Sequence, residues 1–258
     1  EDEDEDEDED KYKFIIESLI HNTLFCHFRG DFGDGARIPK IRFLANINFQ
    51  SQKTFVTGMD EVDIDGKQFL SVEKDLFKQF DMMTQITEFL VRLQKDFQFM
   101  HKDLHIGNIM CKKSKRGEYR WYIIDFGQVS MNVNGQYYHS VEDFPYKKKH
   151  AYNPSHDMRL LISSIYGNVL KKQKLNETLT PFEHIISAYG SIVEKYIQDN
   201  QVFFWGAYGD IVDIFDKAFL PENIYNVFME AKMSLKMGRL NTFIQDELSS
   251  YLKYSNNN

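Results

Sequence analysis

The segment that decides the fold is His101-Lys102-Asp103-Leu104-His105-Ile106-Gly107-Asn108, and after two predicted strands it is followed by Asp125-Phe126-Gly127. In the first segment an asparagine follows an aspartate five residues later, and in the second an aspartate ends a strand and precedes a flexible glycine. Amide and carboxylate oxygens are the ligands that Mg²⁺ prefers, and a further carboxylate can take a proton from an attacking hydroxyl. These groups are typical of phosphoryl transfer, in which the protein mainly positions its substrates and neutralises their charge.

The hydrophobic pattern around these segments predicts the elements that carry them. From Val72 to Met100 apolar residues recur every three or four positions, which indicates one long helix or two consecutive ones. Ile109 to Cys111 and Tyr119 to Ile124 read as short strands on either side of a basic turn, which suits a hairpin. From Asp157 onward the pattern is helical, with Pro181 and Pro221 at helix starts and helices expected over 157–170, 182–198, 207–219, 222–236 and 239–253.

Upstream of the long helix, one helix precedes a pair of strands. Tyr12 to Phe28 carries apolar residues at helical spacing. A glycine-rich loop over 29–37 follows, and then Ile41 to Asn48 and Thr54 to Thr57 read as strands. The first half of the chain is therefore predicted to be mixed and the second half helical.

The catalytic-loop and Asp-Phe-Gly motifs resemble those of the protein kinase superfamily. The Asp-Leu-His-x-Gly-Asn form is closer to its aminoglycoside-phosphotransferase-like and atypical branches than to typical eukaryotic kinases. The resemblance implies that Asp103 is the catalytic base and that Asn108 and Asp125 bind the Mg²⁺ that accompanies ATP. His101 becomes a structural residue of the loop. Lys102 stands where typical protein kinases have arginine, and it lacks the planar fork that grips a phosphate.

Further matches extend the resemblance over about residues 11 to 235. The stretch from Phe55 to Val62 resembles the strand and hinge whose backbone receives adenine, which assigns Met59, Asp60 and Glu61 to ATP binding. If Tyr12 to Phe28 is the helix that supplies the conserved ion-pair glutamate of kinases, Glu17 is that residue. Asp157 resembles the aspartate that opens the large helix of the second lobe and buttresses the catalytic loop.

The resemblance implies an α+β, protein-kinase-like fold with two lobes, a reduced N-lobe and a mostly helical C-lobe. Residues 1–10 form an acidic low-complexity tail, and 11–62 form a partial N-lobe with its hinge near 58–62. Residues 63–258 form the C-lobe, with the catalytic loop at 101–108 and the metal-binding motif at 125–127.

The expected activity is an ATP- and Mg²⁺-dependent transfer of the γ-phosphoryl group to a Ser/Thr hydroxyl of a protein, or to a small-molecule hydroxyl. The alternative is a pseudokinase or a structural subunit that uses the fold as an interaction surface. Its basis is that a glycine-rich phosphate loop and a strand lysine are missing upstream of Glu17. Lys11 and Lys13 lie nearby, but neither is in a strand that resembles Val-Ala-Ile-Lys.

Other interpretations of single motifs are weaker. His101, Asp103 and His105 form a His-x-Asp-x-His set that could hold zinc or iron in a hydrolase, which would leave Asn108 and Asp125 as coincidences. Asp31-Phe32-Gly33 repeats the later tripeptide but does not close a strand, so we interpret it as loop. The basic run 147–149 is a solvated loop or, alternatively, a patch that docks an acidic or phosphorylated substrate.

Charge and composition bound the remaining possibilities. The chain has 258 residues and a formal net charge of -8, but its first ten residues alternate glutamate and aspartate, and the rest has 31 basic against 29 acidic residues. We interpret the acidic repeat as a disordered, solvated spacer, with an electrostatic decoy for nucleic acid as the alternative. The aromatic residues lack interleaved basic residues, so no nucleic-acid partner is predicted.

The same composition bears on location and origin. Two cysteines, Cys26 and Cys111, cannot build a disulfide framework, and no apolar run is long enough to span a bilayer. We expect an intracellular protein, in the cytoplasm, a host cell or a virion. A composition rich in Lys, Asn, Ile and Phe is typical of AT-rich genomes such as those of large DNA viruses and several protists. Glu1 in place of Met indicates a processed product or a fragment of a longer reading frame, and the oligomeric state stays open.

Overall fold

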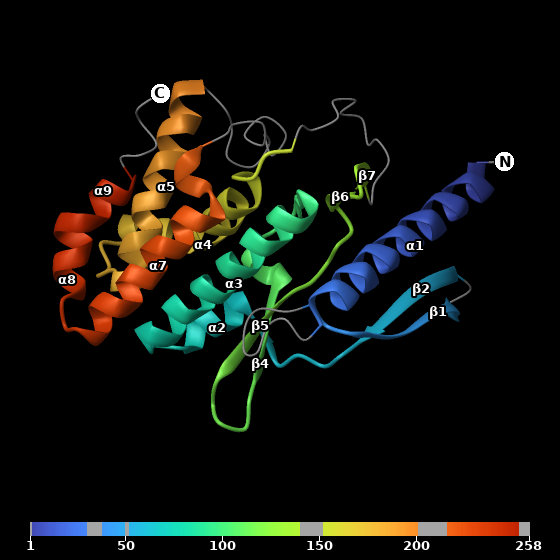
Figure 1. The fold of residues 1–258 in the computed structure, drawn as a ribbon, viewed down its shortest axis with the longest axis horizontal. Coiled ribbons are helices and arrows are strands. Elements are labelled where there is room, and N and C mark those ends of the chain that lie inside the picture. The colour runs from blue at the N-terminus through green and yellow to red at the C-terminus, as the bar shows by residue number, and fades with distance from the viewer. Residues whose placement is uncertain (1, 30–37, 50–51, 140–151, 201–215, 253–258) are drawn as a thin grey trace.

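The fold belongs to the α+β class, with helices and small antiparallel sheets (Figure 1). The structure is a computed structural model, and it describes residues 2–29, 38–49, 52–139, 152–200 and 216–252. The first part mixes helices with three small sheets, and the described residues after 152 are helices and their connections. Among the described helices, none has an apolar stretch long enough to cross a membrane.

The N-terminal region is one helix lying along a two-stranded ribbon. Helix α1 spans Asp2–Phe28, and strands β1 (Ile41–Phe49) and β2 (Gln52–Met59) pair antiparallel, with Ala45 opposite Val56. The helix and the ribbon lie side by side in Figure 1, and Phe14 stacks on Phe55 with ring centroids 5.1 Å apart. Both predicted strands are confirmed; β1 is one residue longer than its pattern, and β2, with 8 residues, extends two residues beyond its pattern at each end.

The acidic repeat is not the disordered spacer that its charge suggested. Its backbone from Asp2 to Asp10 continues α1 without a break. Glutamate is a strong helix former, and acidic residues at a helix N-terminus are favoured by the helix dipole. These two effects act against the repulsion between like charges one turn apart.

The long predicted helix is α3 (Leu76–Phe97), and the shorter α2 (Gly66–Val72) comes before it. The pattern placed a start at Val72, but residues 73–75 separate the two helices, because Asp75 accepts a hydrogen bond from the Phe77 amide and so caps α3. Gln98 ends α3 in the left-handed region with φ 45°. One face of α3 is fully buried and packs chiefly against α7 (Pro221–Lys236).

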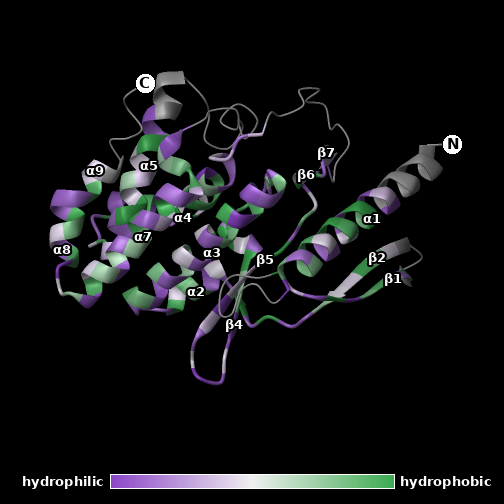
Figure 2. Cartoon of the chain, in the orientation of Figure 1, coloured by the Kyte–Doolittle hydropathy of each residue, from purple (hydrophilic) through white to green (hydrophobic). Residues whose placement is uncertain are grey.

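The predicted hairpin is confirmed as β4 (Ile109–Lys113) and β5 (Tyr119–Ile123), with Ile109 opposite Ile123. A third short strand, β3 (Ile64–Asp65), pairs with β4. The tip of the β4–β5 hairpin is hydrophilic (Figure 2), whereas Trp121 in the middle of β5 is completely buried against Phe69. The hairpin thus connects the two motifs, because β4 begins directly after Asn108 and β5 ends shortly before Asp125.

A second hairpin was not predicted. Strands β6 (Ser130–Val133) and β7 (Gln136–His139) pair across Asn134 and Gly135, whose φ angles are 54° and 87°. Positive φ at both central residues is what a type I′ turn requires, and Asn-Gly is its preferred sequence. The turn signal was present, but the strands on either side of it are short and polar.

The helical half follows the predicted starts. Helices α4 (His156–Lys174) and α5 (Pro181–Asn200) are slightly longer than predicted, and α7 begins at Pro221. The segment expected over 239–253 is a short helix α8 (Leu240–Thr242), a π-helical turn η3 (Phe243–Glu247) and α9 (Leu248–Leu252). Of the helix expected over 207–219, residues 207–215 lie outside the described residues, and Lys217–Phe219 form the 3₁₀ turn η2.

Candidate active site

The loop between α3 and β4 is held from behind by two buried side chains. Asp157, in the first turn of α4, is fully buried and accepts hydrogen bonds from the amides of His101 (2.8 Å) and Lys102 (3.0 Å). The His101 ring, also fully buried, lies 2.9 Å from the carbonyl oxygen of Ile124 through its Nε2 atom. The loop is therefore fixed both to α4 and to the residue that precedes Asp125.

Burial shifts the pKa values of both buttressing groups. Desolvation raises the pKa of Asp157 to about 6, against the lowering effect of the two amide hydrogen bonds and of the nearby Lys102 charge. Desolvation lowers the pKa of His101 to about 4, opposed chiefly by its hydrogen bond to Ile124. At neutral pH His101 is therefore uncharged, with Nε2 carrying the proton that the Ile124 carbonyl accepts.

Asp103 and Asn108 belong to one hydrogen-bonded turn. The side-chain amide of Asn108 donates to the Asp103 carbonyl oxygen at 2.9 Å. The Asn108 carbonyl oxygen in turn accepts from the Ile124 amide at 3.1 Å. These two bonds link Asp103, through Asn108, to the strand end that carries Asp125, so the segments that carry the three predicted residues adjoin.

Asp125 occupies a strained position at the end of that strand. Its φ of 64° lies in the left-handed region, which is uncommon for a residue with a side chain. Its carboxylate accepts from the Gly127 amide at 3.3 Å, and the side chain is exposed. Phe126 is completely buried between the rings of His21 and His101, with centroids at 5.0 Å and 5.7 Å. The anchored phenylalanine holds Asp125 turned outward.

The carboxylate of Asp103 faces solvent beside a histidine. Its Oδ2 lies 4.0 Å from the Nε2 of His105, and the side chains of both residues are 46% exposed. His105 Nδ1 accepts from the Gly107 amide, which leaves its Nε2–H facing the carboxylate. Partial burial raises the pKa of Asp103, His105 lowers it and the charge of Asp125 raises it. The negative charge of Asp125 thus disfavours the charged form of Asp103.

Glu17 reaches the same place from α1. Its Oε2 lies 3.8 Å from the position that a Cβ on Gly127 would take. Burial and the charge of Asp125 raise the pKa of Glu17, and a hydrogen bond from the Phe126 amide opposes the shift. Within the described part of the chain, no lysine or arginine forms an ion pair with this carboxylate. Glu17 therefore contacts the Asp-Phe-Gly motif directly.

A cavity of about 210 Å³ opens between α1, the β1–β2 ribbon and the end of β5. Three of the predicted site residues line it, namely Glu17, Met59 and Asp125. The other lining residues were not predicted to belong to the site, and they are Ser18, His21, Ile41, Thr57 and Ile124. His21 lies one helical turn after Glu17, and burial lowers its pKa. The i, i+4 spacing of the two polar residues on α1 was the one signal that could have identified it.

The three predicted adenine-binding residues do not share this cavity. Met59 lines it, whereas Asp60 and Glu61 do not. The Asp60 amide donates to the Lys40 carbonyl at 2.9 Å, and the side chain of Asp60 pairs with Arg42. The Glu61 carbonyl accepts from Lys112 Nζ at 3.1 Å. These main-chain groups are thus already bonded within the chain.

The donor set fits a hard cation better than zinc or iron. The Nδ2 atom of Asn108 donates to the Asp103 carbonyl oxygen, and within the described residues its Oδ1 makes no hydrogen bond, so this amide oxygen remains available as a ligand. One or two carboxylates with substrate phosphates are the usual ligands of Mg²⁺. The His101, Asp103 and His105 set is less suited to hold zinc or iron, because the His101 ring is hydrogen-bonded to the Ile124 carbonyl and is fully buried. Within the described ranges, no three His, Cys, Asp or Glu side chains are grouped to hold a metal ion.

Two sequence features fall where the structure makes no statement. Asp31-Phe32-Gly33 and the basic run 147–149 both lie outside the described residues.

Neither a protein-family model nor a curated protein sequence matches the chain. The candidate site therefore stands on its own residues and their geometry.

Proposed function

We propose that the chain is an ATP- and Mg²⁺-dependent phosphotransferase with a protein-kinase-like fold, which transfers the γ-phosphoryl group to a Ser/Thr hydroxyl of a protein, with a small-molecule hydroxyl as the less favoured acceptor. In this proposal α1 and the β1–β2 ribbon form the small lobe, and the segments from β3 onward form the large one. One observation carries the proposal. The Asn108 side chain donates to the Asp103 carbonyl oxygen, and the amide of Ile124, which directly precedes Asp125, donates to the Asn108 carbonyl oxygen.

Each residue of this set has a distinct part in the proposed reaction. Asp103 accepts the proton of the acceptor hydroxyl. The hydroxyl oxygen then bonds to the γ-phosphorus, and the bond between the γ-phosphorus and the oxygen that leaves with ADP breaks. His105, whose ring is 4.0 Å from the Asp103 carboxylate, stabilises its charged form. Asn108 and Asp125 would hold Mg²⁺, which when bound neutralises negative charge on the phosphates. Asp157 and His101 keep the loop in place.

The cavity beside Asp125 limits how much of the nucleotide is enclosed. At about 210 Å³ it is smaller than the roughly 300 Å³ at which pockets for drug-sized ligands begin. Part of the nucleotide would therefore lie outside it, and Met59 is the one predicted adenine contact at its wall.

The test is to replace Asp103 with asparagine, which keeps the shape of the side chain and removes the base. We expect transfer of labelled γ-phosphoryl to a mixed Ser/Thr peptide pool to fall by about 10²- to 10⁴-fold. Stabilisation of the protein by ATP and Mg²⁺ in a thermal-shift assay should remain. Glu118→Gln on the exposed tip of the β4–β5 hairpin is the matched control. Undiminished transfer in Asp103→Asn removes Asp103 from the role of base.

The second candidate function is a non-catalytic, pseudokinase-like subunit, and the environment of Glu17 favours it. In the described part of the chain this carboxylate faces Asp125 without a cationic partner, so the pair adds negative charge where phosphates would lie. The two candidates differ in nucleotide binding. A ligand that binds only the native state must raise its stability, so an Mg²⁺-dependent thermal shift supports the enzyme. No shift at millimolar ATP supports the subunit.

A further inference from the structure

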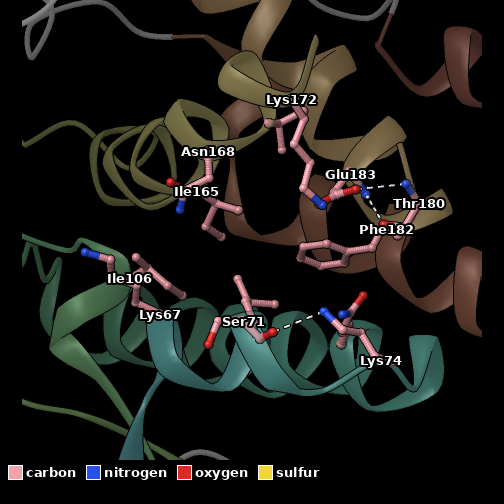
Figure 3. A pocket seen from close by; sticks show the side chains of 13 residues that line it. Lys67, Ser71, Lys74, Ile106, Ile165, Asn168, Lys172, Thr180, Phe182 and Glu183 are labelled. Atoms are coloured by element: carbon pink, nitrogen blue, oxygen red, sulfur yellow. Dashed lines mark hydrogen bonds and ion pairs between the residues drawn. The ribbon is translucent and has the colours of Figure 1, made fainter. Parts of the chain in front are cut away.

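A larger cavity, of about 540 Å³, lies between α2 below and α4 and α5 above (Figure 3). It shares no lining residue with the cavity beside Asp125. Its volume falls within the range of roughly 300–1,000 Å³ that is typical of small-molecule sites. This cavity plays no part in the proposed phosphoryl transfer.

The inner wall of the large cavity is apolar. Ile106, Ile165, Val169 and Phe182 are buried residues that line it, and Leu70 on α2 is a half-buried one. In Figure 3 the Phe182 ring projects from the start of α5 toward the space above α2. An apolar wall with a few polar groups is the usual composition of a ligand pocket. The body of a ligand would therefore be aliphatic or aromatic.

The rim of the large cavity has an excess of positive charge. Lys172 is neutralised there by Glu183, whose carboxylate it contacts at 2.6 Å. Lys74 donates to the Ser71 carbonyl oxygen at 3.1 Å, and Lys67 is exposed. Among the described residues, neither Lys67 nor Lys74 has a carboxylate partner. Two cations at the mouth of the cavity remain available for an anionic group.

One wall residue also has an unused hydrogen-bond acceptor. Gln79 is 6% exposed, and its Nε2 donates to the Glu73 carbonyl at 2.7 Å. Its Oε1 is buried and makes no hydrogen bond within the described part of the chain. Because water does not reach this atom, Gln79 contributes to the wall of the cavity but offers no contact to a ligand through its Oε1.

We propose that this cavity binds a small amphipathic anion, with an apolar body against Val169 and Phe182 and an anionic head at the rim that carries Lys67 and Lys74. Ile106 joins the site to the catalytic loop, because its side chain lines the cavity and its backbone begins the turn that carries Asn108. The proposal is independent of the phosphotransferase activity.

Two dyes of one shape test it. 8-Anilinonaphthalene-1-sulfonate has an aromatic body, an N–H and a sulfonate, and N-phenyl-1-naphthylamine has the same body and N–H without the charge. Each dye is titrated by fluorescence, and the stoichiometry is taken from calorimetry, against four proteins. These are the unaltered chain, the double variant Lys67→Glu/Lys74→Glu, the cavity-filling variant Asn168→Trp and the control Lys171→Glu, an exposed lysine of α4 outside the lining.

We expect one saturable site for the sulfonate dye in the unaltered chain and in Lys171→Glu. The double variant should weaken sulfonate binding about tenfold, because two favourable exposed charge contacts become unfavourable, and should change binding of the neutral dye less than about twofold. Asn168→Trp should remove the site for both dyes. The proposal is overturned if Asn168→Trp leaves sulfonate binding intact, if charge reversal affects both dyes equally, or if no saturable site is found.

Discussion

The buried carboxylate of Asp157 predicts a pH dependence of stability with a definite sign. Two effects compete at this group, since burial favours its neutral form and the amides of His101 and Lys102 favour its charged form. Burial is the larger effect and raises its pKa from 3.8 to about 6. The native state therefore holds a proton on Asp157 in a pH range where the unfolded chain has released it.

The magnitude follows from linkage. A tenfold change in a proton dissociation constant is worth about 1.4 kcal/mol, so this shift corresponds to about 3 kcal/mol. Because the folded pKa is raised, the contribution is fully present below pH 4 and is lost as the pH rises through about 6. His101 acts in the opposite direction. Its pKa is lowered to about 4, so its contribution is present above pH 6.5 and is lost as the pH falls toward 4.

The two residues should nearly cancel in the unaltered chain, and replacing one of them exposes the other. We would measure the free energy of unfolding in urea at intervals from pH 4 to pH 7 for the unaltered chain and for Asp157→Asn. The unaltered chain should lose about 3 kcal/mol relative to the variant over this range. Subtraction removes every group that titrates equally in both proteins.

The direction of this difference decides the question. If the unaltered chain instead gains stability relative to Asp157→Asn as the pH rises, the amide hydrogen bonds outweigh desolvation and the folded pKa of Asp157 is lowered. A flat difference would mean that desolvation does not outweigh the amide hydrogen bonds, which would contradict the raised pKa. Glu177→Ala, an exposed position after α4, should show no such pH dependence and stay within about 0.5 kcal/mol of the unaltered chain.

Other packing features give sharper single-site predictions. Gly190→Ala should lower the free energy of unfolding by about 1–3 kcal/mol, because the added Cβ would come within 2.3 Å of the buried Tyr166 ring. Gly167→Ala has open space around the added Cβ and should raise the free energy of unfolding by about 0.4–1 kcal/mol. Equal effects at these two helix positions would contradict the close approach of α4 and α5. Phe126→Ala should lower the free energy of unfolding by about 3–5 kcal/mol in the same urea assay, because its ring is completely buried. Tyr138→Ala on exposed β7 is the control and should lower it by less than about 0.5 kcal/mol. A loss below about 1 kcal/mol for Phe126→Ala would show that this ring does not anchor the motif.

Much of the local structure could be predicted because it depends on short-range patterns. The spacing of apolar residues indicated α3, and the prolines at 181 and 221 marked the starts of α5 and α7. The alternation around the basic turn predicted the β4–β5 hairpin. The exact start of α3 was wrong because Asp75 caps it, which is a choice between neighbouring polar residues that periodicity does not make.

The candidate site was predictable only in its linear part. The Asp103, Asn108 and Asp125 motifs could be recognised from spacing, and the hydrogen bonds of Asn108 bring them together. The resemblance pointed to Glu17, and His21 follows it at i, i+4 spacing. That both side chains reach Phe126 depends on how α1 packs, which this spacing does not specify. The large cavity is assembled from α2, α4 and α5, so its lysines and its unpaired glutamine oxygen could not be grouped in advance.

The β1–β2 ribbon has little support from the rest of the described structure. Both of its strands are edges in the described structure, and Phe43, Leu44 and Ile47 are 57%, 50% and 44% exposed. Two strands alone are only marginally stable in water, so the ribbon relies on its packing against α1. Its amides should exchange with deuterated solvent through local opening while those of α3 remain protected. We therefore expect one wall of the smaller cavity to separate from α1 without global unfolding, which would widen the access of a ligand to the space beside Asp125.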